Sequence, residues 1–338
     1  MAKATEAIQV VVDGFEVRVS SPSRELRPGW TKQDIIDWFQ IVSEDLRPRI
    51  GGRPLYVVRA ARGDGETFFQ KRAPSKVPDW MGTTTVPFPS GRSALVIAPT
   101  SETAIATLVW LVNLGGLEFH TWPSRTPEVT QFDELRIDLD PAAGTDWSTT
   151  IAGAEAARAV LESHGLSPMP SWSGKGGIHL ISPIVPTSVQ DARAAALAVA
   201  RELERLHPDL VTAQWWKEDR HAPIFCDFNQ MLLDRTMAMP YSPREPAQSG
   251  VVLPISWDAL SEFDPKPLTP AEARSLLGEV GIAATPAQDV VASTLESLLV
   301  LSAEQREAGA QEAPYPPHYP KMEDEGPRVT PSRAKRTD

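Results

Sequence analysis

The stretch that decides the fold is Leu135-Arg136-Ile137-Asp138-Leu139-Asp140-Pro141. Its apolar and polar residues alternate, which is the two-residue period of a β-strand. We expect the three apolar side chains to face a core, and Arg136, Asp138 and Asp140 to face the other way. Pro141 has no N–H to donate to a neighbouring strand, so the strand is expected to end there. The stretch predicts a half-buried strand that carries two acids near its end.

Asp138 and Asp140 stand two positions apart on one face of this strand. Such carboxylates lie about 6–7 Å apart along a strand, so they can ligate one Mg²⁺ or Mn²⁺, or a pair of ions about 3.5–4 Å apart. The alternative is a pair of acids on a solvated strand edge. Asp227 lies in a second predicted strand, residues 224–228, where an unpaired acid is costly to bury. A metal or a salt bridge to an arginine would each satisfy it.

A glycine-rich segment is Ser171-Trp172-Ser173-Gly174-Lys175-Gly176-Gly177-Ile178-His179-Leu180. Its glycines let backbone N–H groups approach an anion closely. It is not a P-loop, because that pattern requires Gly-Lys-Ser/Thr followed by a helix. Ser173, Lys175 and His179 are candidates to bind a triphosphate. The alternative is a flexible turn between a helix and a strand, with His179 at the strand edge.

Basic and aromatic residues are interleaved elsewhere. Phe68-Phe69-Gln70-Lys71-Arg72 sets two aromatics beside cations, an arrangement that can stack a base and hold a phosphate. The alternative places one Phe in the core. Arg220, Arg235 and Arg244 flank Asp227 in the sequence, and the arginine fork suits phosphate, although surface arginines are also ordinary. A lone histidine near aromatics, such as His120, is more often structural.

Composition bounds the class of protein. The chain has 338 residues, 41% hydrophobic and 23% charged, which suits a soluble globular protein with one large core or two joined lobes. It has no apolar run long enough for a membrane span and no secretory signal pattern. Its single cysteine, Cys226, excludes an intrachain disulfide and a cysteine-based zinc site. A net charge of -11 argues against a general nucleic-acid coat protein but not against a local basic groove.

The expected elements mix strands and helices, as in α/β or α+β proteins. Strands are expected at 8–12, 15–19, 55–59, 67–70, 135–139, 177–182 and 224–228. Helices are expected at 31–44, 101–114, 148–164, 188–207, 269–280 and 289–303, with a loop over 71–92. We expect one catalytic domain over 1–308 and a Pro- and charge-rich tail over 309–338.

Three segments occur in the order typical of one family: 138–141, 173–179 and 225–230. Over roughly 17–268 the chain resembles the polymerase domain of bacterial ligase D, in the archaeo-eukaryotic primase superfamily. The resemblance implies an α+β fold with a primase–polymerase-type core, mainly antiparallel and mixed sheets flanked by helices, in two closely joined lobes. Because the chain has no room for ligase or nuclease domains, we expect a stand-alone relative.

The resemblance also implies roles for individual residues. Asp138, Asp140 and Asp227 match the metal carboxylates. The implied nucleotide-binding residues are His120, Ser173, Lys175, His179, Arg220, Arg244 and Arg59. Phe68 and Phe69 match aromatics that stack on the nucleotide or template, and Lys71 follows them. Arg24 and Lys32 stand near the positions that bind a 5′-phosphate at a DNA break.

The implied activity is template-directed nucleotidyl transfer with two Mn²⁺ or Mg²⁺ ions, filling gaps or extending ends in DNA repair. The implied partners are DNA, nucleoside triphosphates, a separate DNA ligase and Ku, in the cytoplasm with the nucleoid. Two alternatives are a metal nuclease or phosphohydrolase, and a non-catalytic DNA-end-binding repair scaffold. The sequence leaves open end joining, excision-repair gap filling or priming, and ribo- or deoxyribonucleotide preference.

Overall fold

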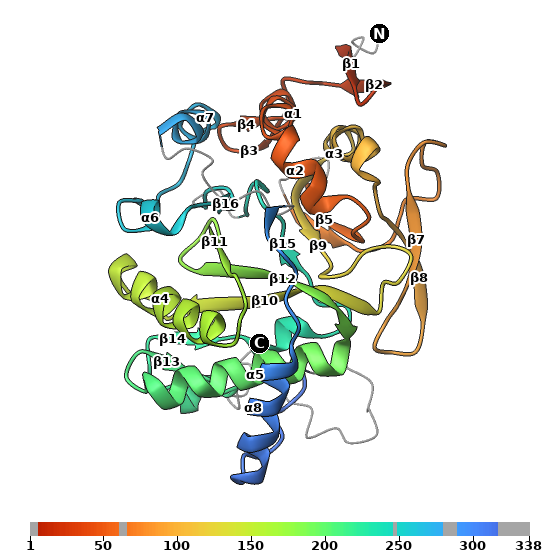
Figure 1. Cartoon of the computed structure of the whole chain (residues 1–338). Coiled ribbons are helices and arrows are strands. Elements are labelled where there is room, and N and C mark those ends of the chain that lie inside the picture. The colour runs from red at the N-terminus through yellow and green to blue at the C-terminus, as the bar shows by residue number, and fades with distance from the viewer. Residues whose placement is uncertain (1–5, 61–65, 246–248, 280–288, 317–338) are drawn as a thin grey trace.

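The computed structural model describes residues 6–60, 66–245, 249–279 and 289–316. Within these ranges the strands form two large sheets and two small strand pairs, with helices packed around them (Figure 1). The β10 sheet has the order β13 (Val211–Thr212), β14 (Ile224–Cys226), β10 (Gln131–Pro141), β12 (Ile178–Ser188), β11 (Met169–Trp172) and β16 (Leu253–Pro254). The β5 sheet has the order β15 (Met237–Ala238), β9 (Gly116–Thr121), β5 (Leu55–Ala60), β8 (Ser93–Ile97) and β7 (Thr83–Pro87), and β6 (Thr67–Gln70) also pairs with β5.

The remaining elements are short strands and helices. The small pairs are β1 (Ala7–Val12) with β2 (Phe15–Ser20), and β3 (Glu25–Arg27) with β4 (Trp30–Thr31). The helices are α1 (Lys32–Ile41), α2 (Ser43–Ile50), α3 (Ala104–Asn113), α4 (Trp147–Ser163), α5 (Val189–Leu206), α6 (Trp257–Leu260), α7 (Pro270–Glu279) and α8 (Glu296–Glu307). The 3₁₀ turns that lie wholly within the described ranges are η1 (Ser101–Thr103), η2 (Lys217–Asp219) and η3 (Phe228–Met231). The architecture is α+β, as expected.

Strand β10 lies at the centre of its sheet. Leu135, Ile137 and Leu139 are buried in the main core as predicted, but Arg136 and Asp138 on the other face are buried as well, so the strand is covered on both faces and not half-buried. The strand pairs antiparallel with β12 on one side and with β14 on the other. Helices α4 and α5 pack against β10 and β12, and α8 packs on the outer side of α5 (Figure 1). The apolar residues therefore fix β10 between helices and neighbouring strands, and its polar face lies away from that core.

Local signals explain most of the elements. The β1–β2 hairpin turns at Asp13 and Gly14, whose φ angles of 55° and 77° fit the left-handed two-residue turn that Asp-Gly favours. Thr31 caps α1 through a capping box with Asp34. Ser188 caps α5 by accepting a hydrogen bond from the Asp191 N–H. The other predicted strands and helices are found within a few residues, and the end of the 269–280 helix lies outside the described residues.

Three predictions of secondary structure were wrong in part. The helix expected over 31–44 ends at Ile41, and α2 begins at Ser43 with acids in its first turn, which suit a helix N-terminus. The expected loop over 71–92 contains β7, whose Thr-rich sequence has β-branched residues suited to a strand. The last helix starts at Glu296 rather than 289, because Ser293 forms a parallel bridge to Ile184 of β12.

A buried ion-pair network connects the two large sheets. Arg53, just before β5, is 2% exposed, and its guanidinium lies 2.6 Å from both Asp133 Oδ1 and Glu134 Oε1 on β10. Glu134 also pairs with Arg136 at 2.6 Å, and Asp133 with Arg125 at 2.9 Å. The network fixes the start of β10 against the start of β5.

No helix within the described ranges is both long and apolar enough to span a bilayer.

Replacing Arg53 should destabilise the fold strongly. In Arg53→Met the carboxylates of Asp133 and Glu134 each lose one buried partner and keep Arg125 and Arg136, so the cost should lie near the lower end of the about 3–5 kcal/mol for breaking a buried pair. Chemical denaturation measures this change. The matched control is Arg205→Met, because Arg205 is an exposed arginine whose ion pair is with Glu202 on the same helix. Equal stabilities of the two variants would contradict the role given to Arg53.

Candidate active site

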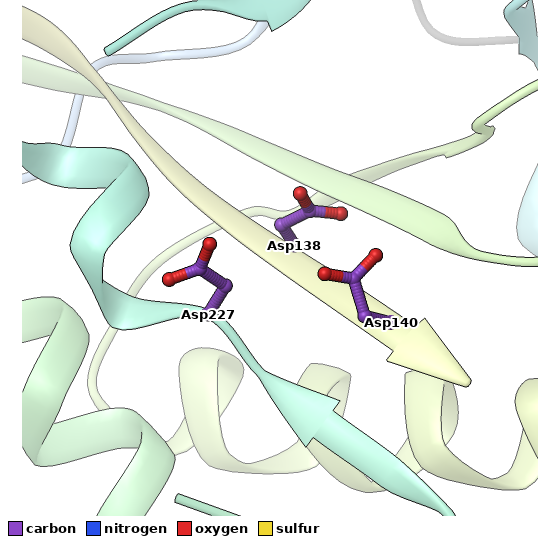
Figure 2. A group of neighbouring side chains, drawn as sticks. All are labelled: Asp138, Asp140 and Asp227. Carbon is purple, nitrogen blue, oxygen red and sulfur yellow. The ribbon is translucent and has the colours of Figure 1, made fainter. Parts of the chain in front are cut away.

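The three predicted acids converge at the rim of the β10 sheet. Leu139 lies opposite Cys226, and the Asp227 N–H donates to the Asp138 carbonyl at 2.9 Å. This pairing sets Asp227, directly after β14, beside Asp138 and Asp140 on β10. Figure 2 shows the three side chains close together where β10 and the end of β14 lie side by side, and one oxygen of each lies within 4.8 Å of the others. Asp227 is thus brought to the pair as predicted, although it caps η3 rather than lying inside a strand.

The cluster carries negative charge that its surroundings do not fully compensate. Burial and the charges of Asp140 and Asp227 raise the pKa of Asp138 well above its ordinary value. Burial, followed by the charge of Asp140, raises the pKa of Asp227 to about 6. Burial also raises the pKa of Asp140, against the opposing effect of Arg220 and other cations. Converging carboxylate oxygens that repel one another fit a hard divalent cation such as Mg²⁺ or Mn²⁺.

Two residues of η3 orient the carboxylates. Gln230 Nε2 donates to Asp138 Oδ2 at 3.0 Å and to Asp227 Oδ2 at 3.3 Å. The Asn229 N–H donates to Asp227 Oδ1 at 3.0 Å. Asp227 is therefore held by an amide and a backbone N–H rather than by an arginine. The sequence analysis did not assign these residues, and the one available signal was their position directly after Asp227.

The glycine-rich loop lies beside the acids. His179 is opposite Asp138 across β10 and β12, with its Nε2 3.7 Å from Asp138 Oδ1. Burial lowers the pKa of His179 well below its ordinary value, so the ring is neutral at pH 7. Ser173 Oγ accepts hydrogen bonds from the N–H groups of Gly177 at 3.1 Å and Lys175 at 3.4 Å, which closes the loop. The structure brings all three predicted loop residues to the region of the acids.

Gly174 allows the loop to contact Arg244. Its φ of +77° is in the left-handed region, and a Cβ there would lie 2.5 Å from the Arg244 side chain. Arg244 reaches Glu118 of β9, with Nη1 3.2 Å from Oε1. The positive charge of Arg244 acts to lower the pKa of Asp138, Asp140 and Lys175, so this cation lies near the acidic cluster. The close packing at Gly174 therefore sets a guanidinium between the loop and β9.

Glu118 is a buried residue that the sequence analysis missed. Its Oε1 lies 2.7 Å from His120 Nε2, and its Oε2 accepts from the Glu245 N–H at 2.7 Å. Burial raises the pKa of Glu118, but the His120 hydrogen bond and the Arg244 charge outweigh it and bring the pKa to about 2. Glu118 thus stays ionised and orients both His120 and Arg244. Its position two residues before His120, on the same face of β9, was the signal that could have identified it.

A cavity of about 260 Å³ opens next to Asp140 and Asp227. Its lining includes the cations Lys217, Arg220 and Arg235. The Arg220 guanidinium lies 3.6 Å from the centre of the Phe225 ring and donates to two backbone carbonyls of the preceding loop. Positive groups therefore line the cavity beside Asp140 and Asp227. One of them, Lys217, was not among the residues predicted from the sequence.

The aromatic residues of β6 lie on its two faces. Phe69 contacts His120 edge to face at 5.3 Å between ring centres, whereas Phe68 lies on the other face under Arg59. Both rings are nearly half exposed, so neither is a core residue. Arg59 donates to the Leu114 carbonyl and, at 2.6 Å, to Gln70 Oε1. Phe69 thus reaches the His120 side, while Arg59 is directed away from it.

The predicted DNA-binding cations differ in exposure. Lys71 is 38% exposed, pairs with Asp234 at 2.5 Å and lies near the ring of Phe88. Arg24 is half-buried in the turn before β3. Lys32 is 3% exposed, and its ammonium donates to the backbone carbonyl of Ser20 at 2.7 Å and that of Asn113 at 2.8 Å. Lys32 is therefore buried, contrary to the surface position that DNA binding requires.

Residues 31–282 match the family described as LigD, primase-polymerase domain. The chain belongs to this family, and the resemblance drawn from the sequence is confirmed.

Relatives support the same assignment. The chain is 30% identical over 311 residues to the multifunctional non-homologous end joining protein LigD of Mycolicibacterium smegmatis, covering 90% of this chain and 40% of that protein. It is 30% identical over 244 residues to the bifunctional non-homologous end joining protein LigD of Bacillus subtilis, covering 71% and 38%. The polymerase domain of Mycobacterium tuberculosis ligase D, solved in complex with DNA, superposes with a TM-score of 0.69 at 30% identity over 80% of this chain and 99% of that one. The chain spans about two fifths of the length of these curated relatives.

The acidic cluster should reduce the stability of the metal-free protein as pH rises. An unfolded aspartate has a pKa of about 3.9, whereas Asp227 in the fold has a pKa of about 6. Below both values each state carries the proton and stability is unaffected. Between them the unfolded chain ionises first, so the fold loses stability until pH passes the folded value.

Asp227→Asn should remove this penalty. In chelator at about pH 7.5, we expect the variant to be more stable than wild type by about 1–3 kcal/mol, and at about pH 3.5, below both pKa values, the gain should nearly vanish. Chemical denaturation at both pH values measures the difference. A variant that is less stable than wild type at the higher pH would contradict the repulsion described above.

Proposed function

We propose that this chain catalyses template-directed nucleotidyl transfer, adding nucleotides to primer 3′ ends at gaps or broken ends during DNA repair. The convergence of Asp138, Asp140 and Asp227 is the observation that carries the proposal. Membership of the LigD primase-polymerase family supports it, as do relatives named for non-homologous end joining and a structural neighbour solved with DNA. Nucleoside triphosphates and primer–template DNA would be the substrates.

The three acids would hold two divalent ions, Mn²⁺ or Mg²⁺. All three acids would hold one ion, and Asp138 and Asp140 would hold the other. Bound there, the ions would lower the pKa of the primer 3′-hydroxyl and neutralise charge on the triphosphate. Gln230 keeps the oxygens of Asp138 and Asp227 directed toward the shared space. This orientation by a neighbouring amide supports a ligand role, because metal ligands are usually fixed by such hydrogen bonds.

Groups around the acids would hold the nucleotide. Lys175 and Arg244 lie on the side of the glycine-rich loop, and Arg220 lies on the cavity side. Cations on both sides suit the charge that develops on the leaving pyrophosphate. His120 Nδ1 and His179 Nδ1 are buried without a hydrogen-bond partner among the described residues, so each can bond a group of the nucleotide.

Exposed aromatic and basic residues would contact the DNA. Phe69 presents a half-exposed ring beside His120, where a nucleotide or template base can stack. Lys71 follows on the same strand end, and Arg24 would bind the 5′-phosphate of a gap or break. A separate DNA ligase and Ku would act with this chain, at the nucleoid in the cytoplasm. Phe68 and Arg59 lie on the face of β6 and β5 opposite to His120, so they support a contact with the nucleotide less directly than Phe69 does.

Primer extension tests the proposal directly. A labelled primer–template with Mn²⁺ and nucleoside triphosphates should yield longer products. Shortened products would instead indicate a nuclease, and tight binding to DNA ends without turnover in any metal would indicate a scaffold. Gapped, overhanging and unprimed DNA, each with ribo- or deoxyribonucleotides, would identify the preferred substrate.

Asp138→Ala or Asp140→Ala should abolish extension. Loss of a metal carboxylate removes several kcal/mol of transition-state stabilisation, so the rate should fall by at least about a thousandfold. DNA binding, measured by fluorescence anisotropy, should stay close to wild type. The matched control is Asp209→Ala, an exposed acid outside the cluster, which should extend normally. Extension by either cluster variant at the wild-type rate would refute the metal assignment.

Arg24→Gln should weaken binding to gapped DNA that carries a 5′-phosphate. A charge-assisted hydrogen bond contributes about 1.5–3 kcal/mol, so the dissociation constant should rise about tenfold or more. The same gap without its phosphate serves as the control substrate, and its affinity should not change. An equal loss on both substrates would show that Arg24 does not read the phosphate.

A further inference from the structure

A short segment after α8 runs back along α5 and ends beside the acidic cluster. We call residues 311–316 the strap. Arg201 of α5 donates to the Gln311 carbonyl, and Arg193, two turns nearer the start of α5, donates to the Ala313 carbonyl at 3.0 Å. The strap lies beyond residues 31–282, which match the family. Its contacts are therefore a feature of this chain that the family match does not account for.

Arg193 anchors the strap. The side chain is buried, and its Nη1 lies 2.7 Å from Glu312 Oε1. Its guanidinium also lies 3.8 Å from the centre of the Tyr315 ring. A buried guanidinium needs acceptors for its five donor hydrogens, and the strap supplies two of them. The contact is thus built into the fold and is not an incidental surface contact.

Asn229 connects this anchor to the acids. Its Oδ1 accepts from Arg193 Nε at 3.1 Å, and its Nδ2 donates to the Pro314 carbonyl at 3.1 Å. Its backbone N–H donates to Asp227 Oδ1 at 3.0 Å. One residue therefore bonds the strap, the anchoring arginine and an acid of the cluster.

The end of the strap borders the active-site cavity. Pro316 is part of the wall of the 260 Å³ cavity that also contains Asp140, Asp227 and Arg220. The strap thus reaches the cluster by two routes, through Asn229 and along this wall.

We propose that the strap is a positioning element of the candidate active site: when docked on Arg193, it fixes Asn229 and thereby the orientation of the Asp227 carboxylate for a divalent metal. The proposal rests on the proposed function, because it takes Asp227 as a metal ligand. Arg193 and Asn229 are positioning residues, since neither reaches the space between the acids. Partners one step removed from a metal ligand fix its orientation, and their loss typically weakens metal affinity about 10- to 100-fold.

Manganese binding to the protein without DNA or nucleotide provides the test. Electron paramagnetic resonance of free Mn²⁺ gives the dissociation constant for the full chain. Arg193→Met removes the anchor, and the double variant Glu312→Ala with Tyr315→Ala releases the strap while keeping the bond from Arg193 to Asn229. We expect both to raise the dissociation constant about tenfold. Arg205→Met on the exposed side of α5 is the matched control and should bind as wild type does.

A second measurement separates positioning from general damage. In primer extension, the Mn²⁺ concentration giving half the maximal rate should rise by the same factor in both strap variants. The rate at saturating Mn²⁺ should remain that of wild type, because the three acids are intact. A loss of rate that saturating Mn²⁺ does not restore would overturn the proposal.

The remaining outcomes are also decisive. If only Arg193→Met weakens binding, Arg193 acts on Asn229 alone and the role of the strap is refuted. If neither variant does so, the whole proposal fails. Failure of the proposed function is measured separately, as absence of primer extension by the wild type or as Mn²⁺ binding that survives Asp227→Ala.

Discussion

The mutual repulsion of three carboxylates is the constraint on which the rest of this structure depends. Asp138, Asp140 and Asp227 have oxygens within 4.8 Å of one another, in surroundings that raise the pKa of each. Such an arrangement persists only where the rest of the fold over-determines it. Three features hold the carboxylates in place here. They are the packed core under β10, the pairing of β10 with β14 and the hydrogen bond from the Gln230 amide. The fold thus holds charge in a place where charge is unfavourable until a cation arrives.

The groups beside the three acids are also held in fixed positions by buried charges and close packing. Glu118, whose pKa is lowered to about 2, stays ionised and holds both His120 and Arg244 by direct contacts. Gly174 lets the loop approach Arg244 more closely than any residue with a side chain could. Three acids are therefore gathered at one point, where metal ions would bind under the proposed function, and at another point a single acid orients its neighbours.

Much of the fold follows from local sequence signals. The β10 alternation, the Asp-Gly turn and the caps at Thr31 and Ser188 each depend on neighbours in the chain, and all were predictable. The second helix at Ser43 and strand β7 were missed because their signals are weak beside the prolines and glycines around them. The start of α8 could not be predicted, since it depends on a bridge to β12 that is distant in sequence.

The candidate site was predictable to a similar extent. The acids and loop residues stand in recognisable order, but Glu118, Gln230 and the burial of Lys32 depend on tertiary contacts. The ion pairs of Arg53 with Asp133 and Glu134 are also tertiary contacts between residues far apart in the sequence. They join the start of β5 to the start of β10, so the sheet that bears His120 and the sheet that bears Asp138 are held together there by buried charges. Under the proposed function, a nucleotide bound between these two sheets would have to match that fixed spacing, and adjustment would fall to side chains at the surface.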